Sequence, residues 1–198
     1  MARAAVESPA LARQASTRHF SRMPQSPPRS STVEPWLNGP VPGVDPYLQP
    51  AAHALLQASE DLDRAARDLS PDELAIRPGG AASVAFHLRH IAGSVDRLLT
   101  YARGAALSDD QHRALVSEST GGNAPGDAAE LIANARAAIA GAIDTLRATP
   151  RDSLLDARAV GKQALPSTVL GLLFHVAEHT HRHVGQAIAT ATAVRGLR

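Results

Sequence analysis

Cysteine is absent from the 198 residues, and aromatic side chains make up only 3% of them. Without cysteine the chain can form neither a disulfide nor a thiolate metal site, and it has no thiol nucleophile of its own. Any bound metal must therefore be held by histidine, carboxylate or water. The scarcity of aromatic residues also argues against the stacking platforms with which proteins bind single-stranded nucleic acid.

Neither sign of charge predominates, and long apolar runs are missing. With 20 basic and 19 acidic residues the formal net charge is +1, so no basic field covers the chain and attracts nucleic acid. No apolar run approaches the roughly 18 residues of a membrane span. We therefore expect a cytoplasmic protein that binds neither nucleic acid nor a membrane.

The character of the sequence changes after its first 31 residues. Residues 1–31 carry five arginines among serine, proline and glutamine, without an apolar period, and are predicted to be a disordered tail. Residues 32–45 form a Pro/Gly-rich lead-in, in which we expect Trp36 to cover the edge of the folded part. Residues 46–195 are predicted to be one domain, because a core of this size can be stable alone.

The folded part is rich in alanine and leucine, which favour helices. Its apolar periodicity predicts long helices over residues 45–69, 81–101, 127–148 and 167–194, and shorter ones over 70–74 and 108–116. Asp45 and Asp127 suit N-cap positions. Residues 117–126 and 150–165 are expected to be connections. The predicted fold class is all-α, a four-helix bundle with short extra helices.

Four of the nine histidines crowd into the last predicted helix, namely His175, His179, His181 and His183. Because each helical residue advances about 100° around the axis, His179 and His183 fall on the apolar stripe, His175 at its edge and His181 on the opposite side. Two unpaired imidazoles on a core face are costly, whereas one divalent metal can bind both in their neutral form. The alternative is a pair of core histidines hydrogen-bonded to their neighbours.

A third ligand would have to come from another helix. The second predicted helix offers His87 and His90, and the first offers His53. By angle His87 lies nearer the apolar stripe and His90 lies toward one flank, so periodicity slightly favours His87 and leaves the choice open. His19 and His112 are expected to be solvated.

Two motifs in this chain resemble the signature regions of the DinB-like (DinB/YfiT) superfamily. They are Pro78-Gly79-Gly80 followed by His90-Ile91-Ala92-Gly93-Ser94, and His179-Thr180-His181-Arg182-His183-Val184-Gly185-Gln186. The resemblance covers roughly residues 46–194 and implies a four-helix bundle of the up-down-down-up type. It also implies a divalent metal on His90, His179 and His183.

The resemblance and the angular count disagree over the third ligand. We adopt His90, because a ligand at a cavity need not lie at the centre of the apolar stripe, although His87 stands one turn before it and the two could exchange roles. The sequence also departs from the family pattern at Ala81, where an aromatic residue often follows the Pro-Gly-Gly element.

A competing motif overlaps the histidine cluster. His175, Glu178 and His179 spell His-x-x-Glu-His, the inverted zinc-protease signature. We discount this interpretation because His175 and Glu178 diverge from the buried stripe. At i, i+4 spacing, Glu178 is expected to pair with Arg182 on the exposed flank.

The resemblance implies a function that the spacing alone does not. Some relatives use their metal to activate a low-molecular-weight thiol, so the first hypothesis is a metal-dependent hydrolase or thiol-S-transferase with a small-molecule substrate. Zinc or nickel is the expected metal, and a small thiol is a candidate cofactor. The alternative is a non-catalytic, metal-stabilised bundle that serves in stress response or partner binding.

Two further features bear on partners and substrates. The last predicted helix has a second apolar line, comprising Leu170, Phe174, Ala177 and Ile188, which predicts a homodimer contact. Arg97 lies close in angle to His90 and could bind an anionic group at the mouth of the cavity. The plainer expectation is a surface arginine paired with Asp96 or Glu60.

Overall fold

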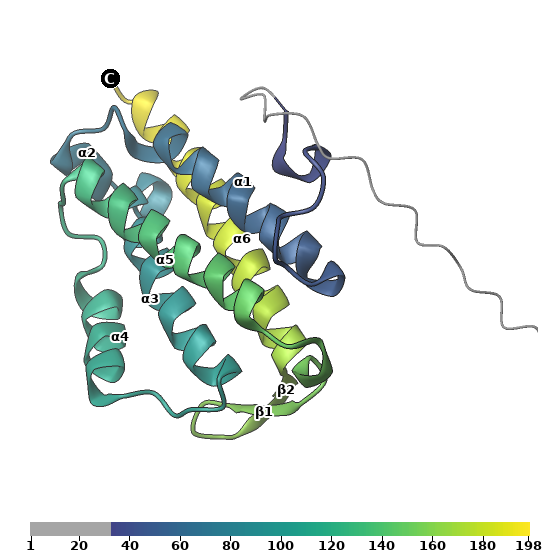
Figure 1. Ribbon diagram of the computed structural model, residues 1–198. Helices are drawn as coiled ribbons and strands as arrows, with labels where there is room; N and C mark the ends of the chain where they lie inside the picture. The colour runs from purple at the N-terminus through teal and green to yellow at the C-terminus, as the bar shows by residue number, and fades with distance from the viewer. Residues whose placement is uncertain (1–32) are drawn as a thin grey trace, which may run out of the picture.

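The computed structural model describes residues 33–198, and the predicted tail of residues 1–31, including His19, lies outside this range. Within residues 33–198 there are six α-helices and one two-stranded sheet. The four long helices are α1 (Gln49–Ala66), α3 (Val84–Ala102), α5 (Ala128–Ala148) and α6 (Val169–Arg195) (Figure 1). The short helices are α2 (Pro71–Ala75) and α4 (Asp109–Gly121). The predicted four-helix bundle is thereby confirmed.

The bundle has the expected up-down-down-up topology. The guanidinium of Arg195, at the end of α6, donates to the backbone carbonyl of Arg64 near the end of α1, at 3.2 Å, so α1 and α6 run in the same direction. His87 near the start of α3 contacts His183 in the later half of α6, so these two helices are antiparallel. Helix α5 lies beside α3 and runs in the same direction (Figure 1).

Aliphatic side chains from all four long helices fill the core. Those that are almost fully buried include Leu55, Leu62, Leu88, Ile91, Ile139, Leu173 and Val176. Each such side chain contributes about 1.5–3 kcal/mol through burial. Among residues 33–198, no helix combines the length and the apolar character that a membrane crossing requires.

Capping side chains set where the long helices begin. The side chain of Ser83 accepts a backbone N–H, so α3 begins at Val84 rather than at the predicted Ala81. Asp127 caps α5 as predicted. Asp45 instead caps a 3₁₀ turn that precedes α1, so the first predicted helix is divided in two.

Two segments predicted to be irregular contain regular structure. Helix α4 continues to Gly121, so the expected loop over residues 117–126 begins within a helix. The expected connection over residues 150–165 contains a 3₁₀ turn and most of an antiparallel hairpin, β1 (Ala157–Val160) and β2 (Leu165–Thr168). The fold is therefore mostly rather than purely helical, and α6 begins only after the hairpin.

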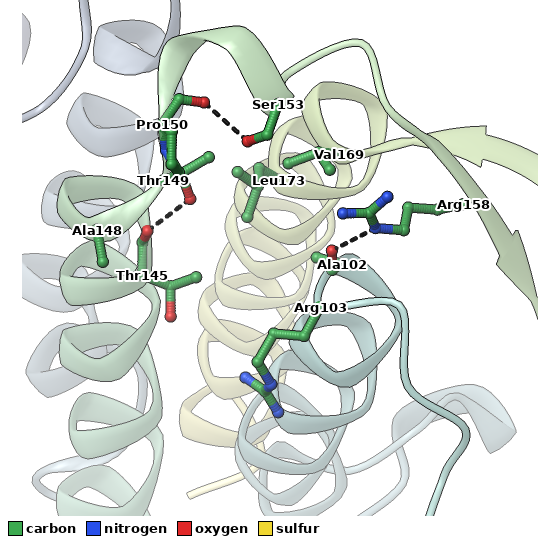
Figure 2. A pocket seen from close by; sticks show the side chains of 10 residues that line it. All are labelled: Ala102, Arg103, Thr145, Ala148, Thr149, Pro150, Ser153, Arg158, Val169 and Leu173. Atoms are coloured by element: carbon green, nitrogen blue, oxygen red, sulfur yellow. Dashed lines mark hydrogen bonds between the residues drawn. The ribbon is translucent and has the colours of Figure 1, made fainter.

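The hairpin closes the end of the bundle where α3 and α5 finish. The Nε of Arg158 donates to the carbonyl of Ala102 at 2.8 Å, and so satisfies one of the backbone acceptors that the end of α3 leaves open. Figure 2 shows Arg158 and Arg103 beside a pocket of about 320 Å³ between these elements. The residues that line this pocket include no histidine or carboxylate, so it is not a metal site.

The lead-in does not bury its tryptophan, and the prediction for Trp36 was wrong. Its side chain is 60% exposed, and its indole N–H donates to the carboxylate of Glu34 at 2.6 Å. A tryptophan keeps its polar edge satisfied most easily at the surface, and here a neighbour within the same 3₁₀ turn supplies the acceptor.

Candidate metal centre

His90 of α3 and His179 and His183 of α6 converge at one edge of the bundle. The Nε2 atoms of His90 and His179 lie 2.8 Å apart. One ligand atom from each of the three residues lies within 4.8 Å of the other two. His179 and His183 are one turn apart, with ring centroids 4.5 Å from each other. The three imidazoles are close enough to share one cation.

A carboxylate from α4 contacts the outer nitrogen of His90. The Oε1 of Glu118 hydrogen-bonds to Nδ1 of His90, and the guanidinium of Arg97 donates to the same carboxylate over 3.2–3.3 Å. The side chains of Glu118 and Arg97 are each only 9% exposed. An ionised carboxylate can only accept, so Nδ1 of His90 carries the proton and Nε2 turns its lone pair toward the other histidines.

Burial and hydrogen bonding act on Glu118 in opposite directions. Burial alone would raise the pKa of its carboxyl, but the hydrogen bonds from His90 and Arg97 outweigh this effect and hold the pKa below its usual value. The carboxylate is therefore ionised at neutral pH and remains an acceptor for His90.

His87 contacts the cluster through His183. Its Nδ1 lies 3.0 Å from Nδ1 of His183, and its residue is only 5% exposed. This contact engages the Nδ1 of His183 and leaves Nε2 as the atom that could bind a metal. His87 thus supports one member of the trio rather than joining it. Its deep burial agrees with its place on the apolar stripe.

Burial keeps the rings of His179, His183 and His87 neutral. It lowers the pKa of His179 to about 4 and that of His183 to about 3, and the neighbouring His90 adds to both effects. The pKa of His87 is lowered to about 4 for the same two reasons. A metal binds the neutral ring, so His179 and His183 are in the ligating form at neutral pH.

The chemistry of these donors fits a divalent metal. The Nδ1 of His179 is buried and has no hydrogen-bond partner among residues 33–198. The protein holds this ring by packing and by the contact of its Nε2 with Nε2 of His90, and a metal at Nε2 would orient it further. The site also reaches solvent, since the side chain of His90 is 19% exposed. Three ligands at a partly open site leave a position for water or substrate.

The other histidines lie outside this trio. His53 contacts a backbone carbonyl of the lead-in at 3.0 Å. His181 and His112 are exposed, as predicted. His175 is also exposed but lies beside His179, with ring centroids 5.3 Å apart. His53 is thus engaged elsewhere, whereas His175 stands next to the cluster without converging on it.

The His-x-x-Glu-His stretch does not form a protease site. Glu178 accepts hydrogen bonds from Arg182 over 2.5–2.9 Å, which confirms the predicted i, i+4 pair. His175 contacts the same carboxylate at 3.4 Å and projects from the exposed flank of α6. A general base would need to face the metal, and Glu178 is instead held by its arginine.

The partnership of Glu118 with Arg97 was not predicted. Glu118 was predicted to lie in a loop, and Arg97 was expected at the cavity mouth or paired with Asp96 or Glu60. Gly93 was the one indication of this contact in the sequence, because a glycine inside a helix often marks a point where another element approaches closely. A Cβ there would lie 2.5 Å from Oε2 of Glu118 and 2.7 Å from a guanidinium nitrogen of Arg97.

Comparison with known proteins agrees with these observations. A sequence model of the DinB superfamily matches residues 54–187, a span that includes all three converging histidines. No curated protein matches the chain. Because the match covers more than half of the sequence, the chain belongs to the DinB superfamily.

Proposed function

We propose that this protein binds one divalent metal ion through His90, His179 and His183 and uses it to catalyse a reaction of a small molecule. The observation that carries the proposal is the convergence of three imidazoles from two helices. Zinc and nickel are the metals we propose, because both accept imidazole ligands readily and the site offers no thiolate.

We propose one of two reactions, either the hydrolysis of a small molecule or the transfer of a small thiol to it. When bound, a metal would act as a Lewis acid and lower the pKa of a coordinated water or thiol. Since the chain has no cysteine, the thiol would have to be a small molecule. His87 is buried against His183, and His53 contacts a backbone carbonyl of the lead-in, so neither ring is free to accept a proton from a coordinated water or thiol.

A non-catalytic, metal-stabilised bundle is the second candidate, with a role in stress response or partner binding. It is favoured by the buried groups that brace the cluster, since His87, Glu118 and Arg97 would suit a purely structural site equally well. The two functions differ in whether the metal retains an open position.

Cobalt substitution separates these candidates. The metal-free protein is loaded with Co²⁺, and 2-mercaptoethanol is then added as a small thiol probe. We expect a new sulphur-to-cobalt absorption band for an open site. An unchanged cobalt spectrum would contradict the thiol-transferase proposal and favour a closed structural site. A His183→Ala variant serves as the control, because it should lose the protein-bound cobalt spectrum.

We also propose that two copies of the chain associate through the outer face of α6. Phe174 on this face is 59% exposed, and Leu170 and Ile188 are half-buried. Ala177, which the sequence placed on the same apolar line, is buried within the bundle. The exposed part of the line is consequently centred on Phe174.

A further inference from the structure

We propose that Glu118 and Arg97 are positioning residues that fix the ring of His90 and strengthen its bond to the metal. This inference rests on the proposed metal site and assigns it a support from a third helix. A carboxylate that accepts the outer N–H of a metal-bound histidine fixes its tautomer and increases its basicity, and loss of such a partner typically costs about 10–100-fold in metal affinity.

The carboxylate of Glu118 is held on two sides. Its Oε1 bonds to Nδ1 of His90, while Arg97 donates to both carboxylate oxygens. Arg97 comes from α3, seven residues and about two turns after His90. Because a buried carboxylate without a counter-ion is strongly unfavourable, Arg97 is what allows a charged acceptor to lie against His90.

Helix α4 is anchored to the bundle on both sides of Glu118. Near its beginning, the amide of Gln111 donates to Asp96 at 2.7 Å and to Thr100 at 2.8 Å, both on α3. At its end, Arg89 of α3 donates to the carbonyl of Gly122 at 2.7 Å. These contacts fix the helix that carries Glu118. The carboxylate is therefore already in position beside His90, and no mobile segment has to become ordered for the two to bond.

Gly93 provides the space for this arrangement. It lies between His90 and Arg97 on α3, and a side chain there would overlap the carboxylate and the guanidinium. Glycine inside a helix costs about 1 kcal/mol relative to alanine. The sequence thus has a weaker helix former at the position where the side chains of Glu118 and Arg97 lie against the backbone of α3.

The test compares three variants. Glu118→Gln removes the charge but keeps the shape and an amide oxygen. Arg97→Met combined with Glu118→Leu replaces the ion pair with apolar side chains, which buried sites often tolerate. Glu178→Gln is the matched control, because Glu178 precedes His179 directly but bonds to Arg182 instead of a histidine of the trio.

Two quantities are measured on each variant. The first is the Kd for Zn²⁺, determined by competition with a chromophoric chelator. The second is the tautomer of His90 in the metal-free protein, determined by NMR of ¹⁵N-labelled histidine. A general loss of packing would not by itself change which ring nitrogen carries the proton. Far-UV circular dichroism confirms that each variant is folded, and the isosteric Glu118→Gln decides the matter if the double variant is not.

The expected results are specific. Glu118→Gln should weaken zinc binding about 10-fold and the double variant about 10–100-fold. Glu178→Gln should change the Kd by less than about 3-fold, as for an exposed ion pair. His90 should carry its proton on Nδ1 in the wild type and lose this preference in the double variant.

Two results would overturn the inference while leaving the metal site intact. One is that the wild type and both Glu118 variants bind zinc equally well with the same His90 tautomer. The other is that Glu178→Gln weakens binding as much as Glu118→Gln, since the effect would then be one of nearby charge alone. If the wild type binds no metal, the proposed function and this inference fail together.

Discussion

Replacing Gly93 with alanine tests how firmly the carboxylate of Glu118 is held. The new methyl group would approach Oε2 of Glu118 to 2.5 Å and a nitrogen of Arg97 to 2.7 Å. Both atoms are at the ends of flexible side chains, which could move aside cheaply in a loose structure. Here they are buried and bonded to each other, and Glu118 is also bonded to His90.

The expected magnitude follows from two opposing effects. Alanine is favoured over glycine in a helix by about 1 kcal/mol, whereas overpacking a filled site costs about 1–3 kcal/mol. The matched control is Gly141→Ala on α5, because that position is exposed and a Cβ there meets no atom of residues 33–198 within 4 Å. Gly141→Ala should therefore gain stability, and Gly93→Ala should lie about 1–3 kcal/mol below it.

Urea unfolding of the metal-free variants, followed by far-UV circular dichroism, measures this difference. If Gly93→Ala gained as much stability as Gly141→Ala, the carboxylate would be free to move. That result would refute the reasoning that Glu118 and Arg97 form a rigid support for His90.

Two further predictions concern pH and association. Because burial lowers the pKa of His87 and His179 to about 4 and that of His183 to about 3, the unfolded chain binds protons first as the pH falls below about 6.5. The metal-free protein should therefore lose about 1.4 kcal/mol of stability per pH unit for each such histidine between about pH 6 and about pH 5. Urea midpoints that stay constant over this range, or that fall equally in a His179→Ala/His183→Ala variant, would contradict this. In sedimentation velocity we expect the wild type to be a dimer and Phe174→Glu to be a monomer. Leu115→Glu, at an exposed position on α4, is the control and should remain a dimer. A monomeric wild type would exclude the dimer.

Most of the fold could be predicted because it depends on local patterns. Apolar residues at helical spacing identified the four long helices, and residues such as Asp127 marked where they begin. The hairpin over Ala157–Val160 and Leu165–Thr168 was missed because each strand has only four residues, and the half-buried positions of β1 include the charged Arg158, so no apolar alternation marks the strand. Trp36 was misplaced because apolar size alone does not determine burial when a local hydrogen bond is available.

The candidate site was predictable only in part. Helical angle placed His179 and His183 on one inward stripe, but it favoured His87 over His90, and only the family resemblance selected His90. In the structure both residues touch the cluster, His87 through Nδ1 of His183 and His90 through Nε2 of His179. The role of Glu118 could not be predicted, because its contact joins two residues that lie 28 positions apart on different helices, and no periodicity encodes such a pairing.

The zinc content of the purified protein after equilibrium dialysis tests the central claim most directly. The wild type should retain one Zn²⁺ per chain, as should His181→Ala, whose ring is exposed on the far side of α6. A His179→Ala/His183→Ala variant that remains folded should retain none. Equal zinc content in that variant and the wild type would contradict the assignment of these histidines as ligands.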